Sequence, residues 1–270
     1  MSTENTTDKE IKLKPRKHPV LWQAYKTWYE WSELCKRHTL RISAIERGAS
    51  TYSIAFEQSV LDTIKYVTVG GRKRTTLGYF EKVLHEQGEA VGPIYQWLCG
   101  IKGINAQLAS KLLALIDDIE ESPTISSLWR YAGYAVVNGR REYPRKGEKL
   151  HYNKELKSVV WQVGDSFIRQ HTPLYTDFYY VVKAEYQGRF PEPVCTECDT
   201  PISQCANKKG HEKMRRYTRA HIDNMSRRRM AKLFLSHLWL KWREFEGLPV
   251  SAPYAFSVAG HSIEHMIPPP

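Results

Sequence analysis

The chain contains 270 residues with a formal net charge of +11 and an isoelectric point near 9.3, a length sufficient for one large domain or two small domains with a buried core. Its aromatic content of 12% excludes a disordered basic tail, and the excess of cations favours a polyanionic partner. A membrane is a weaker candidate than nucleic acid because no apolar run approaches the roughly 20 residues of a spanning helix and the N-terminus lacks a signal-peptide core, so we expect a cytoplasmic, nucleoid-associated protein.

The N-terminal region is expected to be an arm followed by a long helix. Residues 1–18 are polar and basic, which is typical of a flexible basic arm. No Gly or Pro interrupts residues 20–47, and aromatic and leucine side chains recur there at helical intervals. This pattern predicts one long helix that is closed by Gly48.

Residues 19–92 as a whole are expected to form a helical region with coiled-coil character. A second apolar series covers 54–67, the glycine-opened basic sequence 70–74 is expected to be a loop, and a short helix is expected over 78–92. Two arrangements fit the first two apolar segments. They pair as a helical hairpin within one chain, or they form one half of an intermolecular bundle and thereby a homodimer.

The segment from Gly100 to Asn105 has the sequence Gly-Ile-Lys-Gly-Ile-Asn between two apolar series of helical spacing, which predicts a helix-hairpin-helix. Gly100 and Gly103 permit positive φ angles, and Asn105 stands where many such hairpins carry a third glycine, since Asn is the next best residue for a left-handed backbone. Lys102 lies at the tip. Exposed turn amides and a helix N-terminus suit a phosphate, although a corner that only packs is the alternative interpretation.

The acidic run at 117–121 follows the hairpin. It is expected to be a solvated helix end or loop rather than a metal site, because no second carboxylate group of matching spacing lies nearby. A short helix is expected over 125–134. A longer one should begin after the N-cap Asn153, with a core-facing stripe made by Leu156, Val159, Val160, Val163 and Phe167.

A basic loop separates these two helices. Its candidate nucleic-acid contacts are Arg140, Arg141, Arg145, Lys146 and Lys149. Glycine and proline residues within the loop prevent a regular helix, so the cations are expected on an extended backbone that follows a track of phosphates.

Several of these elements occur in a characteristic order. They are Trp97-Leu98, Gly100 to Ile104, Ala109, Leu112, Ser127, Trp129, Tyr131-Ala132-Gly133, Arg145 to Gly147, Asn153, Leu156-Lys157 and Trp161. This order resembles the C-terminal transposase domain of the bridge-RNA-guided DEDD insertion-sequence transposases. The resemblance covers about residues 93–185, and residues 20–92 resemble the coiled coil of that family in character only. It implies a DNA-binding, transposase-like protein of a mobile genetic element or phage that acts in DNA recombination.

The chain departs from this family in two places. The family carries a RuvC-like nuclease domain ahead of its coiled coil, whereas here about 90 residues precede the hairpin, they read as helices, and they lack strand-borne acidic residues for two metal ions. The family also places a nucleophilic serine after the Tyr-Ala-Gly element. Here Asn138-Gly139 stands there, and an amide cannot form the covalent phosphodiester; Ser126 and Ser127 are more simply helix-capping residues.

The sequence Cys195-Thr196-Glu197-Cys198, followed by Cys205 and then His211 or His221, predicts a structural zinc knuckle within residues 186–225. His211 fits the local spacing better and is the expected fourth ligand, whereas His221 belongs to a longer helical pattern. Free surface thiols or a disulfide are the alternatives, and an intracellular location disfavours the disulfide.

The C-terminal segment, residues 226–270, is expected to contain an amphipathic helix and a tail. Arg227, Arg228 and Arg229 close a run of high positive charge and are candidate nucleic-acid contacts. The apolar face that follows is formed by Met230, Leu233, Phe234, Leu238, Trp242 and Phe245. This helix should end at Gly247.

The sequence therefore predicts a mainly α protein: a helical hairpin or coiled coil at 19–92, a helix-hairpin-helix domain at 93–185, a zinc knuckle and a C-terminal amphipathic helix. Its expected partner is duplex or branched DNA, with RNA as an alternative. The protein is expected to contact the sugar–phosphate backbone and to have no nuclease activity of its own. The competing hypothesis is an active transposase, recombinase or structure-specific nuclease.

Overall fold

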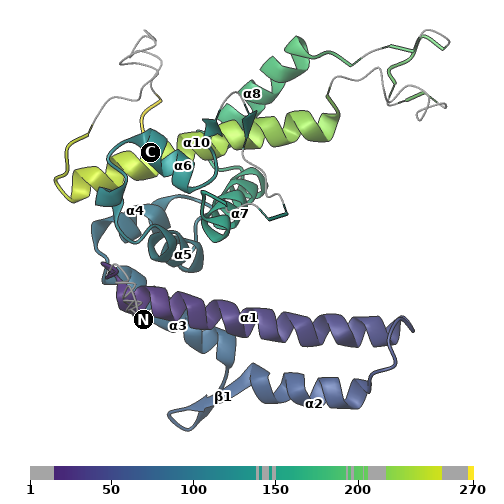
Figure 1. The fold of residues 1–270 in the computed structure, drawn as a ribbon, viewed down its shortest axis with the longest axis vertical. Coiled ribbons are helices and arrows are strands. Elements are labelled where there is room, and N and C mark those ends of the chain that lie inside the picture. Colours follow the sequence, from purple (N-terminus) through teal and green to yellow (C-terminus); the bar gives the residue numbers. More distant parts are fainter. Residues whose placement is uncertain are drawn as a thin grey trace, which may run out of the picture.

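The computed structural model describes residues 15–137, 140–141, 146–147, 150–192, 194–195, 198–202, 204–205, 217–250 and 267–270. The described residues are mostly helical, with two short antiparallel strand pairs, so the predicted mainly α class is confirmed. In Figure 1, the first three helices form one layer, and the last helix crosses the other side of the molecule. No helix in these ranges is long and apolar enough to cross a bilayer.

Helix α1 (Pro19–Glu46) matches the predicted long helix, and its end is closed by Gly48 with a φ of 70°. The amides of Gly48 and Ala49 donate to the last-turn carbonyls, as expected of a Schellman cap. Helix α2 (Ile54–Lys65) folds back along α1, and a buried pair, His38 Nδ1 and Glu57 Oε2 at 2.6 Å, joins them. The chain therefore contains the helical hairpin, and an intermolecular bundle of these helices stays a prediction.

The basic sequence at 70–74 was expected to be a loop, and that expectation is wrong. Strands β1 (Tyr66–Val69) and β2 (Arg72–Thr75) pair as an antiparallel ribbon. Gly70 and Gly71 form its two-residue turn with φ angles of 56° and 74°. Positive φ at both central residues is the geometry of a type I′ hairpin turn, which matches the twist of the strands. Helix α3 (Thr76–Glu89) follows directly and packs on α1.

The central helices are α4 (Pro93–Gly100) and α5 (Ala106–Ile116), followed by the 3₁₀ turn η1 (Ile119–Glu121) and α6 (Ile125–Tyr131). Strands β3 (Val136–Val137) and β4 (Arg140–Arg141) form a second short pair. Every residue of α5 from Ala109 onward is buried, because α1, α3, α4 and α7 all pack around this helix.

Helix α7 (Lys154–Gln170) begins after Asn153, whose side chain accepts the amide of Leu156, and its predicted apolar stripe is buried. Helices α8 (Tyr175–Arg189) and α10 (Arg219–Phe245) pack against each other. Helix α10 begins at Arg219, so the three consecutive arginines lie inside it. Most of its predicted apolar face is buried, but Phe245 in the last turn is 46% exposed and does not belong to that face.

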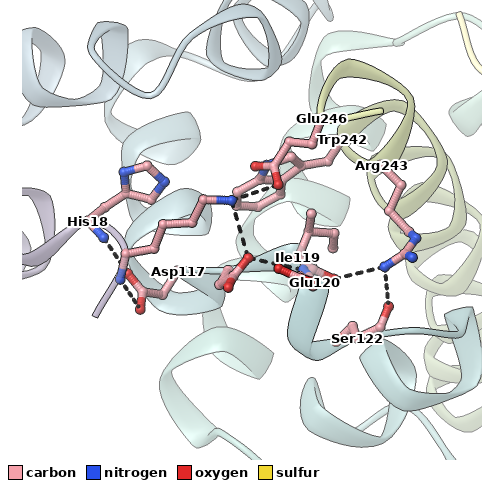
Figure 2. A network of polar contacts seen from close by, with 10 residues as sticks. His18, Asp117, Ile119, Glu120, Ser122, Trp242, Arg243 and Glu246 are labelled. Carbon is pink, nitrogen blue, oxygen red and sulfur yellow. Dashed lines mark hydrogen bonds and ion pairs between the residues drawn. The ribbon is translucent and has the colours of Figure 1, made fainter. Parts of the chain in front are cut away.

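The acidic run lies at the end of α5 and in the turn after it, as expected, and Glu120 and Glu121 are exposed, but Asp117 and Asp118 have partners within the chain. Asp117 accepts hydrogen bonds from the backbone amides of Lys17 at 3.2 Å and His18 at 3.0 Å, just ahead of α1. The Lys17 ammonium bridges Asp118 at 3.3 Å and Glu246 at 2.7 Å (Figure 2). The run therefore ties the start of α1 to the ends of α5 and α10, which are far apart in sequence.

Candidate nucleic-acid interface and metal centre

The hairpin joins α4 to α5 through residues 101–105. The side chains of Ile101 and Ile104 are buried and fix the turn to the core. Gly103 has a φ of 94°, as the sequence predicts for a glycine of the turn. Gly100 does not have a positive φ, because it is the last residue of α4.

Asn105 is not left-handed either. Its φ of −89° and ψ of 169° are extended, and its side chain accepts the amide of Leu108 at 2.9 Å. The residue is the N-cap of α5, a position at which Asn is among the best residues. Its role in the hairpin is therefore to start a helix, and its side-chain oxygen is already occupied.

The hairpin carbonyls are held on the inner side of the turn. The Lys102 carbonyl accepts from Thr172 Oγ1 at 2.8 Å, and the Gly103 carbonyl accepts from Ser166 Oγ at 2.6 Å. Because a trans peptide unit points its N–H opposite to its C=O, the Gly103 amide points away from Thr172. The amides of Lys102 and Gly103 donate to no residue within the described ranges, and the Lys102 residue is exposed. The turn thus presents two unused donors beside a cation.

One side of the hairpin is lined by the C-terminal tail. A groove of about 440 Å³ is formed by Trp97, Gly100, Ile101, Lys102, Thr172, Pro173, Tyr175 and Pro270. The indole of Trp97 donates to the main-chain oxygen of Pro270 at 3.1 Å, and His237 Nε2 lies 2.9 Å from the Ile267 carbonyl. The tail therefore narrows access to the hairpin from this side.

The basic loop is described only in part. The backbones of Arg140 and Arg141 pair with Val137 and Val136, and Lys146 is exposed. Arg145, Lys149 and the side chains of Arg140 and Arg141 lie outside the described residues. The chain nevertheless begins this loop as a strand pair, consistent with the prediction that it is not a helix.

The three consecutive arginines of α10 make internal contacts. Arg227 pairs with Asp223 at 2.7 Å and Asp165 at 3.1 Å, Arg228 donates to the carbonyls of Tyr134 and Ala135, and Arg229 pairs with Glu185 at 2.8 Å. Successive residues of a helix point in different directions, so each arginine fastens α10 to a different neighbour. The sequence predicts that Arg227, Arg228 and Arg229 form a continuous basic surface, and it gives no indication of these partners within the chain.

The strongest of these links surrounds Asp223, between α8 and α10. Burial alone would raise the pKa of Asp223, but hydrogen bonds from Tyr179, Arg227 and Lys183 lower it to about 2. The carboxylate is therefore charged at neutral pH and holds Arg227, whose side chain is 19% exposed. This arrangement assigns Arg227 a packing role.

The predicted metal ligands Cys195, Cys198 and Cys205 converge. Their sulfur atoms all lie within 4.8 Å of one another, and the three thiols are free of disulfides. The amide of Cys195 donates to the Thr200 carbonyl at 2.8 Å, and the amide of Cys205 donates to the Pro201 carbonyl at 3.2 Å. Hydrogen bonds from Thr200 and then from Cys195 lower the pKa of the Cys198 thiol, which favours the thiolate form that binds metal. Three converging thiols fit a tetrahedral zinc ion that lacks one further ligand.

The two candidates for the fourth ligand differ in position. His221 lies in the first turn of α10 with its ring stacked on Tyr217 at 4.7 Å, and it does not join the cysteine group among the described residues. His211, the expected ligand, lies outside those residues. The assignment of His211 as the fourth ligand therefore stays a prediction from the sequence spacing.

Sequence reasoning missed the residues that orient the hairpin. Ser166 lies on α7 and Thr172 in the turn after it, more than 60 positions from Gly103 and Lys102, whose carbonyls they contact. No local pattern marks such partners, because both are ordinary hydroxyl residues whose role depends on how α7 packs.

Comparisons of this chain with protein-family models, with curated proteins and with solved structures found no match.

Proposed function

We propose that this protein binds nucleic acid by its sugar–phosphate backbone, with the α4–α5 hairpin as the central contact. The observation that carries the proposal is the geometry of the turn: two carbonyls are tied inward by Thr172 and Ser166, and the amides of Lys102 and Gly103 have no partner among the described residues. Unused backbone donors, an exposed ammonium and the nearby N-terminus of α5 are complementary to one phosphate.

The charge of the whole chain supports the same partner. A net charge of +11 attracts a polyanion at long range, and the exposed Lys146 is a further contact from the basic loop. Contacts to phosphates carry no sequence information, so binding should be weakly specific and should fall steeply with salt. Duplex or branched DNA is the preferred partner. Titrations of the protein with DNA and with RNA under the same salt conditions distinguish the two partners.

The finer assignment is a transposase-like domain, as the resemblance implies, without its own nuclease activity, as the departures from that family imply. Two serines are already engaged: Ser127 Oγ donates to the Thr124 carbonyl at 2.6 Å within the capping box of α6, and Ser166 Oγ donates to the Gly103 carbonyl of the hairpin. These bonds support structural roles for both hydroxyl groups. The cysteine group is assigned to a structural zinc ion held by Cys195, Cys198, Cys205 and His211, which would stabilise the segment that leads into α10.

Fluorescence anisotropy with labelled duplex and four-way DNA tests the binding function. Replacing Lys102 with alanine should lower the slope of log K against log salt by about 1, because one phosphate contact is lost. The matched control is Lys82→Ala, which removes the same charge from an exposed pair with Glu86 on α3. Equal binding by both variants would exclude the hairpin from the interface.

The enzymatic alternative is tested with the same protein. Incubation with duplex, forked and four-way substrates and Mg²⁺ is expected to leave the strands uncut and unlinked to protein. Cleaved or covalently attached DNA that persists after repurification would favour the recombinase or nuclease hypothesis instead.

A further inference from the structure

The β1–β2 ribbon is an exposed basic element outside the hairpin. It projects from the junction of α2 and α3, and Figure 1 shows it extending away from the other helices. We propose that this ribbon is a second nucleic-acid contact, which enters the major groove of a duplex. The proposal rests on the function proposed above and names double-stranded DNA as the partner.

The charge of the ribbon is of one sign. Residues 65–75 contain Lys65, Arg72, Lys73 and Arg74 and no acidic residue. All four cations are exposed, and none forms an ion pair with a carboxylate of the described residues. This contrasts with α10, where each of three arginines has an internal partner. Four cations without a carboxylate partner among these eleven residues are complementary to a phosphate-lined groove.

The ribbon gains little from packing on its own protein. All four residues of β2 are exposed, and β1 is only partly covered. An isolated two-stranded ribbon is marginally stable, and strands of a folded protein normally bury one face. Alternate residues of β1, Val67 and Val69, are partly covered, whereas β2 is exposed on both of its faces, and a partner that covers β2 would explain this exposure.

The base of the ribbon is nevertheless fixed in direction. Ile64 precedes β1, and its carbonyl accepts two hydrogen bonds of 2.8 Å. One comes from Trp31 Nε1 of α1 and the other from Thr76 Oγ1, which directly follows β2. Thr75 also caps α3 through the Gly78 amide. The Gly70-Gly71 turn closes the tip with no side chain in the way. The ribbon is thus a preoriented projection and not a free loop, which lowers the entropic cost of binding.

The shape favours a duplex over a single strand. Paired strands lie about 4.8 Å apart, and a two-stranded ribbon fits a major groove about 12 Å wide. Single-strand binding relies on exposed aromatic platforms. The ribbon offers only Tyr66, and the Lys73 ammonium lies 4.2 Å from the centre of its ring.

The test uses the full-length protein with Arg72→Gln, Lys73→Gln and Arg74→Gln combined. Its matched control is Lys36→Gln, Lys82→Gln and Lys241→Gln, which removes three charges from helical ion pairs. Affinity for duplex and single-stranded DNA of equal length is measured over a range of salt. The ribbon variant should lower the duplex slope of log K against log salt by about 2 to 3, and the control should not.

Dimethyl sulfate provides the groove-specific measurement, because guanine N7 lies in the major groove. Guanines should be protected by the unaltered protein and exposed with the ribbon variant. Normal duplex affinity of the ribbon variant, an equal loss on single strands, or unprotected guanines would overturn the ribbon proposal alone, provided that Lys102→Ala still weakens binding. If the unaltered protein binds no nucleic acid at all, the proposed function and the ribbon proposal both fail. Circular dichroism confirms that the variant is folded.

Discussion

At the scale of single residues, Gly103 shows what the sequence could and could not reveal. Its type predicts a positive φ, and the structure has a φ of 94°. A Cβ atom there would lie 3.1 Å from Thr172 Oγ1 and 3.3 Å from Ser166 Oγ, so the same hydroxyls that orient the carbonyls also exclude a side chain. The need for glycine was readable from sequence, whereas this second reason depends on the packing of α7.

Gly103→Ala is therefore expected to destabilise the protein by about 1 to 3 kcal/mol, through strained backbone and the tight contact. The matched control is Gly100→Ala, because Gly100 is helical and no atom lies within 4 Å of its added Cβ. That change should be neutral or stabilising by up to about 1 kcal/mol. Urea unfolding measures both, and equal stability of the two variants would contradict the assigned backbone geometry.

Lys111 is a second residue whose environment only the structure reveals. It is 6% exposed on α5, and its ammonium lies 3.8 Å from the centre of the Trp28 ring. Burial lowers the pKa of Lys111 to about 8, with Glu81 opposing the change. The cation–π contact compensates only part of the lost hydration.

The folded pKa of Lys111 lies below its unfolded value, so the unfolded chain binds more protons between about pH 8 and 10, and stability due to this residue should rise with pH there. Lys111→Met keeps the apolar stem and removes the proton. The free energy of unfolding should then depend less on pH between 8 and 9.5, as measured by urea titrations at several pH values. An unchanged pH dependence would contradict a neutralised Lys111.

At the scale of elements, helices were predictable and their partners were not. The cap of α1 at Gly48, the N-cap of α7 at Asn153 and the stripe that α7 buries are local patterns, and the structure confirms them. The ribbon also had a local signal, since the β-branched run at 67–69 precedes Gly-Gly, but the basic charge favoured a loop. Asp223 and Arg227 are four positions apart on α10 and are therefore a local helical pair, but the contacts of Arg228 with Tyr134 and of Arg229 with Glu185 carry no local signal, because those partners lie 94 and 44 positions away.

The tail at 267–270 gives a prediction about the hairpin. The tail is held by two hydrogen bonds, with Trp97 and with His237, each worth about 1 kcal/mol, so removing residues 267–270 should raise DNA affinity by up to about thirtyfold if the tail restricts the groove. Trp97→Phe, which removes the indole donor together with part of the ring and leaves the His237 bond, should give a smaller gain of up to about fivefold. Lower affinity after removal of the tail would indicate that the tail itself contacts the partner.

The cysteine element gives a prediction about metal. Purified protein should carry about one zinc per chain, and chelation should reduce helicity near the start of α10. Cys198→Ser should abolish zinc binding, whereas Cys99→Ser should not, because Cys99 is an exposed thiol outside the converging group. Elemental analysis under reducing conditions decides this, and metal-free wild-type protein would exclude the zinc assignment.

At the scale of the whole molecule, one hydrophobic core joins segments that the sequence divides into several. Leu21 of α1, Leu84 of α3, Leu113 of α5, Val160 of α7 and Trp242 of α10 belong to the same buried cluster. The polar contacts of Lys17 with Asp118 and Glu246 join the same distant segments at the surface (Figure 2). Boundaries drawn from composition could not reveal this, because the core is assembled from residues more than 200 positions apart.

A shared core predicts that the helices from α1 to α10 unfold together. Trp242 is fully buried, so Trp242→Ala should cost about 3 to 5 kcal/mol and should lower the unfolding midpoint seen by far-ultraviolet circular dichroism as one step. The fluorescence of the remaining tryptophans of this variant should change in one step at the same midpoint. Trp22 and Trp28 of α1 report on this step because they pack against the core that contains Trp242 in the unaltered protein. If the helices at 19–89 instead melted separately and were insensitive to Trp242→Ala, the N-terminal layer would be an independent domain. The ribbon and the hairpin would then have to be treated as contacts on two bodies that move relative to each other, and their contributions to DNA affinity would add only when the linker between them allowed both to bind.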